Sequence, residues 1–235
     1  MQRYKLLIFL AVWKRPEITE ICFMGISRLK RLFPMQAFAV ISEKSMKPLC
    51  KKYGIDYCIH DNLPLGRKKN FGLQVALKKD WDFMIEIGSD DLLKNQIFDL
   101  YDYRGDRVSA LQDFAVINSE NSDCRSYHFK EGRFGVGRMI PRQAIEAMAT
   151  DDGMNLWLDG QNNNMDNRSC LALAKEGFME KRFESDTPLA IGIKGPDNIW
   201  PFDYTRGREF DIDKALEGLS VDEVTAIKSL IHVTV

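Results

Sequence analysis

The chain has 235 residues, of which 45% are hydrophobic and 29% charged, and its 33 basic and 34 acidic side chains give a formal net charge of −1. This length is enough for one domain with a large core, and the balanced charge excludes a broad electrostatic surface for nucleic acid. The five cysteines are scattered and contain no C-x-x-C pair, which argues against a disulfide framework or a zinc site and favours a reducing compartment.

The N-terminal stretch combines a basic start with an eight-residue apolar run over residues 6–13, as signal peptides do. Because it has no small-residue cleavage site and continues directly into charged residues, we expect a buried first strand instead. We also find no apolar stretch long enough to span a bilayer. The chain is therefore expected to be cytoplasmic.

Strands alternate with helices in the first 90 residues. Apolar runs typical of strands buried on both faces of a sheet occupy residues 4–12, 35–42, 55–60 and 81–88. Helical patterns separate them over residues 16–33, 43–54 and 67–80. This alternation predicts βαβ units and a mainly parallel sheet.

The second half of the chain is less regular. We expect β segments at residues 106–119, 124–134 and 187–195, and helices at residues 141–150 and 166–177. Ser220 and Glu223 have capping-box spacing ahead of an apolar stripe, which predicts a last helix near the C-terminus.

Two adjacent acids, Asp90 and Asp91, follow the fourth predicted strand. Open α/β sheets bind ligands beyond the carboxyl ends of their strands, and two hard carboxylates there suit Mg²⁺ or Mn²⁺. Such a cation would also relieve the repulsion between the acids. The same residues are equally typical of a helix start, with Ser89 or Asp90 capping a helix through Leu92 and Leu93.

Three cations, Arg67, Lys68 and Lys69, stand at the start of the predicted helix 67–80. Cations at this end oppose the helix macrodipole, so helix stability does not explain them. A diphosphate lying near the helix N-terminus would compensate their charge. A solvated basic face is the alternative, and we favour the anion site.

Residues 11–17, AVWKRPE, follow the first strand and are expected at the same edge of the sheet. Trp13 has a flat ring suited to stacking on a nucleobase, although a core position is equally typical of tryptophan, and Arg15 is long enough to reach a phosphate. Glu43, after the second strand, has the chemistry to accept hydrogen bonds from a ribose or base, although a surface position is the default for glutamate.

These motifs, in this order, resemble the nucleotide-binding half of a glycosyltransferase with the GT-A fold, most similar to family 2. The matching strings are WKRPE (13–17), GRKKNFG (66–72) and EIGSDD (86–91). Gly88 stands where the family usually has its first aspartate, so metal binding would rest on Asp90 or Asp91, with Glu86 as a further acid nearby. The implied fold is a three-layer α/β/α sandwich, with a nucleotide-sugar half (1–105), an acceptor half (106–205) and a helical tail (206–235).

The resemblance also implies site residues. Those expected to bind the nucleotide-sugar are Ala11, Trp13, Arg15, Glu43, Gly66, Lys68, Lys69, Asn70, Ser89 and Asp90. Residues 156–178 resemble the segment that carries the family's acidic catalytic base, where Asp166 matches best and Asp159 second. A carboxylate there would take the proton from an attacking sugar hydroxyl, while a helix N-cap is the alternative role for Asp166. Lys194 and Trp200 are expected to contact a phosphate or the acceptor.

The expected function is transfer of a sugar from a nucleoside-diphosphate sugar to a saccharide or lipid-linked acceptor, assisted by Mn²⁺ or Mg²⁺ and inverting if Asp166 is the base. A sugar nucleotidyltransferase ranks lower because residues 11–17 contain no glycine. A non-catalytic nucleotide- or carbohydrate-binding module is the third alternative, since Gly88 is what a decayed metal site would carry. We expect no nucleic-acid partner, and membrane contact only at the periphery, through residues 200–202 or the last helix.

Overall fold

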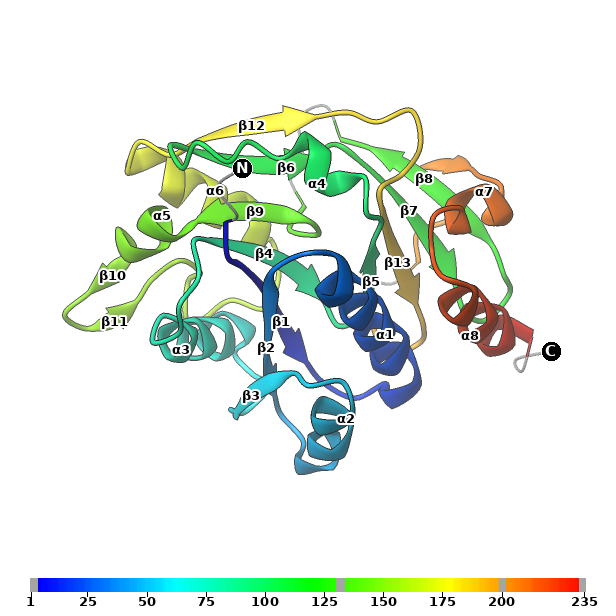
Figure 1. Cartoon of the computed structure of the whole chain (residues 1–235), viewed down its shortest axis with the longest axis horizontal. Coiled ribbons are helices and arrows are strands. Elements are labelled where there is room, and N and C mark those ends of the chain that lie inside the picture. Colours follow the sequence, from blue (N-terminus) through cyan, green and yellow to red (C-terminus); the bar gives the residue numbers. More distant parts are fainter. Residues whose placement is uncertain (1–3, 130–133, 199–201, 233–235) are drawn as a thin grey trace.

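The computed structural model describes residues 4–129, 134–198 and 202–232, and within them a seven-stranded sheet forms the centre of the molecule (Figure 1). Its strand order is β12-β6-β9-β4-β1-β2-β3. The strands are β1 (Leu6–Val12), β2 (Met35–Ile41), β3 (Asp56–Ile59), β4 (Phe83–Gly88), β6 (Arg107–Leu111), β9 (Arg138–Pro141) and β12 (Met179–Phe183). β1 pairs in parallel with β2 and β4, whereas β9 pairs antiparallel with β4 and β6. The predicted mainly parallel sheet is confirmed.

Helices cover both faces of this sheet, because the side chains of β1 alternate between two hydrophobic cores. Leu6, Ile8 and Leu10 pack on the face covered by α1 (Pro16–Leu32), η1 (Lys44–Met46), α2 (Lys47–Lys52) and α4 (Ile97–Leu100). Leu7 and Phe9 pack on the opposite face, covered by α3 (Leu65–Ala76), α5 (Arg142–Glu146) and α6 (Met165–Lys175). The result is the expected three-layer α/β/α sandwich.

A second sheet of five strands, in the order β14-β8-β7-β13-β5, lies beside the first. Its strands are β5 (Asp91–Leu93), β7 (Asp113–Asn118), β8 (Cys124–His128), β13 (Ala190–Lys194) and β14 (Arg208–Glu209). A small hairpin of β10 (Ala149–Thr150) and β11 (Gly153–Met154) completes the β structure of the described residues. The chain passes from the central sheet to the second sheet through the turn at Ser89 and Asp90, so this turn sits where the two sheets meet.

The C-terminal helices α7 (Ile212–Leu216) and α8 (Val221–His232) pack with α1 over the second sheet (Figure 1). The predicted capping box is present: Ser220 N donates to Glu223 Oε2 at 2.6 Å, and Glu223 N donates to Ser220 Oγ at 3.3 Å. Glu223 also accepts from Arg28 Nε of α1 at 2.8 Å, and both side chains are buried. The C-terminal helix α8 is thus joined to α1 by a buried ion pair.

Several element predictions for the second half are wrong in detail. Residues 106–119 form two strands that belong to different sheets, since β6 joins the central sheet and β7 the second. β8 ends at His128, and residues 130–133 lie outside the described residues. Pro141 closes β9 instead of opening a helix, so α5 begins at Arg142. β5, β9 and β12 were not predicted, because three to five residues are too few to show a period.

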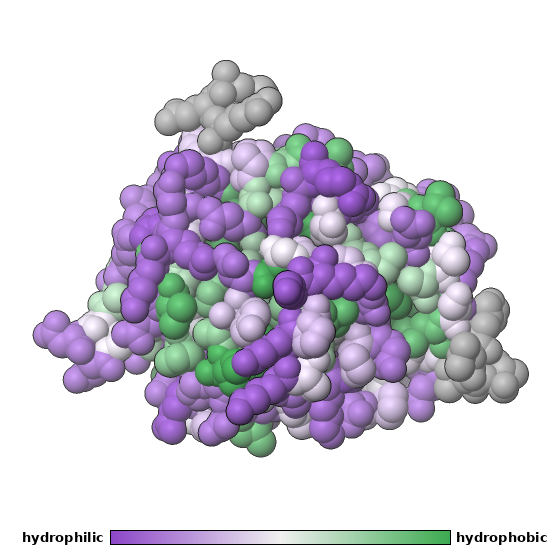
Figure 2. Space-filling model, turned by 60° about the horizontal axis from the view of Figure 1, so that its bottom comes forward, coloured by the Kyte–Doolittle hydropathy of each residue, from purple (hydrophilic) through white to green (hydrophobic). Residues whose placement is uncertain are grey.

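The surface is mainly hydrophilic on the face shown in Figure 2, where apolar side chains lie in small separate patches. In the part of the chain that the structure describes, every helix is too short or too polar to cross a lipid bilayer.

Candidate active site

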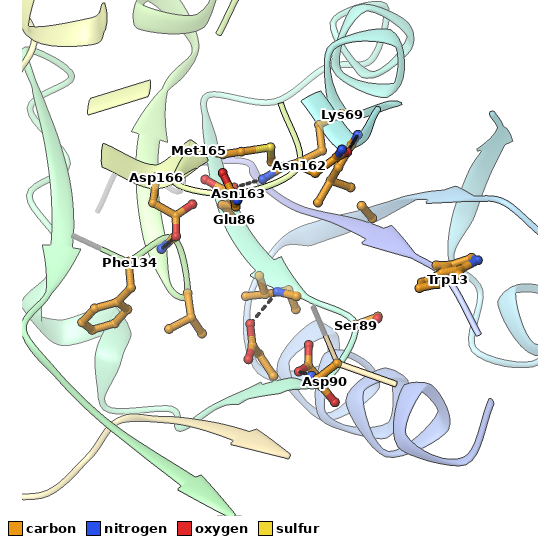
Figure 3. A pocket seen from close by; sticks show the side chains of 18 of the residues that line it. Trp13, Lys69, Glu86, Ser89, Asp90, Phe134, Asn162, Asn163, Met165 and Asp166 are labelled. Atoms are coloured by element: carbon orange, nitrogen blue, oxygen red, sulfur yellow. Dashed lines mark hydrogen bonds and ion pairs between the residues drawn. The ribbon is translucent and has the colours of Figure 1, made fainter. Parts of the chain in front are cut away.

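A pocket of ≈ 300 Å³ opens at the carboxyl ends of β1 and β4, where α/β sheets commonly bind ligands (Figure 3). Trp13 lies at one side of it, Phe134 and Asp166 lie at the other, and Ser89 and Asp90 lie between them. The predicted site residues that line it are Ala11, Trp13, Arg15, Lys69, Ser89, Asp90, Asp91, Asp166 and Lys194. Residues from both halves of the chain therefore meet in one cavity.

The turn that follows β4, which we call the acid turn (residues 88–91), brings two carboxylates together. Asp91 Oδ2 accepts a hydrogen bond from Gly88 N at 2.5 Å. A Cβ atom on Gly88 would lie 2.7 Å from Asp90 Oδ1 and 2.8 Å from Asp91 Oδ2. Glycine is needed here because the carboxylates occupy the space of a side chain. The helix-cap alternative for Ser89 or Asp90 is wrong, since Asp91 begins strand β5.

The two acids of the turn have unequal surroundings. Asp90 Oδ2 accepts from Lys194 Nζ at 2.6 Å and Asn198 Nδ2 at 2.5 Å, and lies 3.4 Å from Arg15 Nη1. Burial alone would raise the pKa of Asp90, but the charges of Lys194 and Arg15 outweigh it and hold the pKa below its usual value. For Asp91, burial and then the charge of Asp90 raise the pKa to about 7. Asp90 is therefore ionised at neutral pH, whereas Asp91 keeps its proton to a higher pH than an ordinary aspartate.

This donor set fits a hard divalent cation. Asp90 Oδ1 and Asp91 Oδ2 both face the space over Gly88, and the charge of Asp91 is poorly compensated. Among the described residues there is no group of three or more His, Cys, Asp or Glu side chains arranged to hold a metal. The protein would therefore supply two oxygens, and the other ligands would come from a diphosphate and water, as is usual for Mg²⁺.

Arg15 is held over the acid turn by an uncommon backbone. Lys14 and Arg15 both adopt the left-handed region, with φ values of 54° and 51°, which non-glycine residues rarely occupy. The Arg15 guanidinium donates to Ser89 Oγ at 3.3 Å from Nη2. Its Nε atom is buried and has no hydrogen-bond partner among the described residues. Such a guanidinium has donors left for an anion.

The three cations at the start of α3 point in different directions and form no common anion site. Lys68 is fully buried and donates to Val12 O at 2.7 Å and Asn62 Oδ1 at 3.1 Å. Arg67 is exposed and lies 3.5 Å from Asp159 Oδ2. Each cation has its own partner within the protein, and these contacts offset the unfavourable position relative to the helix dipole. The helical pattern of the sequence does not indicate these partners.

Lys69 belongs to a buried charge network that reaches the pocket. Its Nζ atom pairs with Glu86 Oε1 and lies 4.0 Å over the Trp157 ring. Arg138, fully buried on β9, donates to Glu86 Oε2 at 2.6 Å and to Ser169 Oγ at 2.8 Å. Burial opposes ionisation of Glu86, but Lys69 and Arg138 together hold its pKa below the usual value.

Asp166 sits beside this network in the first turn of α6 and lines the pocket (Figure 3). The N-cap alternative is wrong, because Asn164 occupies the cap position and the Asp166 carboxylate instead accepts from Gly135 N at 2.8 Å. Burial, followed by the charge of Glu86, raises the pKa of Asp166. A partly buried carboxylate with a raised pKa is suited to general-base work.

Other expected site residues lie outside the pocket lining. Asn70 Nδ2 donates to Trp157 O at 2.6 Å and to Asp159 Oδ1 at 2.8 Å, which fastens α3 to the loop around Leu158. A Cβ on Gly66 would approach Leu158 O to 2.0 Å, so this glycine allows the close approach. Gly66, Asn70 and Asp159 therefore serve to pack α3 against residues 157–159. Glu43 accepts from Lys14 N at 3.3 Å, and Trp200 lies outside the described residues.

Several lining residues escaped the sequence analysis. They include Asn62, Phe114, Phe134, Asn162, Asn163, Asn164, Asp197 and Asn198. The run of three asparagines was the one visible signal, since consecutive amides next to a predicted base are unusual in a plain loop. The aromatic side chains gave no signal, because their strand and loop are brought to the pocket by long-range pairing.

No protein-family model matches the sequence, and no curated protein matches it either. Among solved structures, mannosyltransferase PcManGT from Pyrobaculum calidifontis, in complex with GDP-Man and Mn²⁺, is similar with a TM-score of 0.54 and 10% identity, over 82% of this chain and 57% of that chain. TarS of S. aureus is similar with a TM-score of 0.52 and 12% identity, over 80% of this chain and 36% of that chain.

The inositol-1-phosphate CTP transferase from T. maritima is similar over nearly its whole length, with a TM-score of 0.51 and 10% identity over 97% of this chain and 96% of that chain. At these identities the likeness establishes the fold alone. The chain has the GT-A-type α/β fold that these glycosyltransferases share with nucleotidyltransferases, and it spans less than two thirds of the length of PcManGT and of TarS.

Proposed function

We propose that the chain is a glycosyltransferase that moves a sugar from a nucleoside-diphosphate sugar to a saccharide or lipid-linked acceptor. The observation that carries this proposal is the pairing, in one pocket, of the acid turn with Asp166. The acid turn offers a cation and diphosphate site, and Asp166 offers a base on the other side of the cavity. PcManGT, which has a similar fold, is in complex with GDP-Man and Mn²⁺.

The diphosphate of the donor would lie at the acid turn. Arg15 and Lys194 line the pocket there, and both carry the positive charge that a phosphate requires. Asp90 and Asp91 would hold the divalent cation, which when bound stabilises the charge that develops on the departing diphosphate. Arg15 has unpaired donors and would orient the phosphate oxygens next to the cation.

The acceptor hydroxyl would lie beside Asp166. As its oxygen bonds to the anomeric carbon, the bond from that carbon to the diphosphate oxygen breaks, and the hydroxyl proton passes to the Asp166 carboxylate. Asp166 and the acid turn lie apart in the pocket. If Asp166 is the base, the hydroxyl would attack from the side opposite to the leaving diphosphate, with inversion at the anomeric carbon. Gly135 N, by donating to Oδ2, keeps the base in place.

A nucleotidyltransferase is the second candidate, because the CTP transferase matches this chain over almost the full length of both. Such an enzyme would take a nucleoside triphosphate and a sugar phosphate and release pyrophosphate. Against it, the turn between β1 and α1 has no glycine to bring backbone amides close to a triphosphate, and Arg15 occupies that place.

The test measures binding and then turnover. Thermal stabilisation by UDP-, GDP-, CDP- and dTDP-sugars, each with Mn²⁺ and with a chelator, is expected to show one nucleotide class that requires the metal. This shift should vanish in Asp91→Ala and persist in Asp151→Ala, an exposed aspartate on the β10–β11 turn. Transfer or donor hydrolysis is then followed with the donor that binds.

Different outcomes separate the candidates. Pyrophosphate release from a nucleoside triphosphate and a sugar phosphate, without consumption of any nucleotide-sugar, would replace the proposal with the nucleotidyltransferase. Binding that a chelator does not affect and that gives no turnover would favour a non-catalytic binding module. The absence of any nucleotide binding would contradict the donor site itself.

A further inference from the structure

One side of the pocket contains polar groups that the proposed reaction does not use. Asn62, in the loop between β3 and α3, lines the pocket together with Ala11 and Trp13. The acid turn follows β4, and the strand order β4-β1-β2-β3 places Asn62 on the far side of β1. The pocket therefore extends from the acid turn across the end of β1 to Asn62, and the ribose and base of the donor would lie along this part of it.

Lys68 fixes the orientation of the Asn62 amide. The Lys68 Nζ atom lies 2.7 Å from Val12 O and 3.1 Å from Asn62 Oδ1, and its side chain is fully buried. Burial lowers the pKa of Lys68 to about 8, so it remains cationic at pH 7. An ammonium group only donates hydrogen bonds, so the amide oxygen has to face Lys68 and the amide NH₂ has to face away.

The NH₂ group of Asn62 has no acceptor of its own. Its Nδ2 atom is buried and has no hydrogen-bond partner among the described residues. A buried donor without an acceptor is costly, and native proteins rarely keep one unless a ligand or water completes it. Because the orientation is locked by Lys68, the group cannot turn over to act as an acceptor.

We propose that Asn62, positioned by Lys68, makes this pocket select a nucleotide whose base carries a carbonyl, and not an amino group, at the edge that faces Asn62. The inference rests on the proposed donor site and adds the class of base. Uracil and thymine carry a carbonyl at C4 and guanine at C6, whereas cytosine and adenine carry an amino group at the same positions. A base amino group facing the Asn62 NH₂ would leave two donors opposed, and a site built for one hydrogen-bonding partner rejects its mismatch strongly.

The test compares nucleotides whose bases exchange a carbonyl for an amino group at that position. Calorimetric titration of the full chain at pH 7 with Mn²⁺ uses two pairs, UDP against CDP and GDP against ADP. We expect the keto member of one pair to bind at least about tenfold more tightly than its amino partner, the size of effect that one mismatched hydrogen bond produces.

Two variants assign the preference to Asn62. In Asn62→Asp one carboxylate oxygen pairs with Lys68 and the other becomes an acceptor, so the keto-to-amino affinity ratio should fall at least about tenfold. Asn62→Ala removes the donor without adding charge and should bring the ratio close to one. Asn155→Asp, an exposed asparagine beside the β10–β11 hairpin, introduces the same charge elsewhere and should leave the ratio unchanged.

The outcomes separate this inference from the proposed function. Equal or tighter binding of the amino member in both pairs, or a ratio that neither Asn62 variant changes, would overturn the role of Asn62 while leaving the donor site intact. If none of the four nucleotides binds the unmodified chain, the donor site fails and this inference fails with it.

Discussion

The pocket contains two pairs of acids. In each pair, cations compensate the charge of one carboxylate, and the other carboxylate has weaker compensation and a raised pKa. In the acid turn, Lys194 and Arg15 compensate Asp90 and leave Asp91 with a raised pKa. On the other side, Glu86 is compensated by cations and Asp166 is left with a raised pKa.

The pairs differ in how they are assembled. Asp90 and Asp91 are neighbours in the chain, and a glycine before them makes the space they share. Glu86 and Asp166 come from β4 and α6, and Arg138 from β9 fixes their arrangement by bonding to Glu86 Oε2 and to Asp166 O. Titratable groups whose surroundings drive their pKa values apart commonly have different roles in a site, which here are the proposed cation site and the proposed base.

The largest expected effect comes from removing the guanidinium of Arg138, which joins Glu86 to the backbone of Asp166. Arg138→Met leaves the buried Glu86 charge with Lys69 as its remaining ion-pair partner in the described network, and should lower the free energy of unfolding by about 3–5 kcal/mol. Urea unfolding measures it, with Arg168→Met, an exposed arginine of α6, as the control. A loss below about 1 kcal/mol would show that the network is not needed to hold the second pair.

The next effect is on the rate. Asp166→Asn removes the proposed base and should lower kcat by about 10²-fold or more, with donor affinity changed by less than about threefold. Because the pKa of Asp166 is raised, the kcat of the unmodified protein should fall with acid at a pH above the ordinary range of aspartate. A variant that retains most of its kcat would remove Asp166 from the mechanism.

The third prediction is that the carboxylate of Asp91, which would bind the cation, lowers the free energy of unfolding when no cation is bound. The pKa of Asp91 is about 7 in the folded protein and near the ordinary value of about 4 in the unfolded chain. The protonated side chain therefore contributes fully to the free energy of unfolding below pH 4, and this contribution is lost as the pH rises through 7. In chelator, Asp91→Asn should therefore gain about 1–3 kcal/mol relative to the unmodified chain between pH 5 and pH 8. Thermal unfolding across this range checks it, and a difference that does not change with pH contradicts it.

The smallest effect concerns the space over Gly88. Gly88→Ala places a Cβ 2.7–2.8 Å from both carboxylate oxygens, so the pair has to separate. We expect Mn²⁺-dependent donor affinity to fall about tenfold, or about 1.4 kcal/mol, with a smaller loss of stability. Gly160→Ala is the matched control, because a Cβ there has no atom within 4 Å. Equal effects of the two substitutions would mean that the carboxylates do not need this space.

Much of the first half of the fold follows from the sequence. The apolar runs of β1, β2 and β4 are long enough to show their type, and helical stripes separate them, so the parallel sheet and the position of the acid turn at its edge could be predicted. Asp90, Asp91 and Arg15 could be placed at this edge from the sequence because a local pattern defines where a parallel strand ends, and all three line the pocket.

Tertiary structure decided the partners of the buried charges. Lys68 and Lys69 are neighbours in one helical turn, but about 100° separates consecutive side chains, so one reaches Val12 O and the other Glu86. It also decided that β6 and β7 belong to different sheets, and that Arg138 reaches both Glu86 and α6. These contacts join residues far apart in the chain, and a local pattern has no means of specifying which distant group completes a buried charge or an open strand edge.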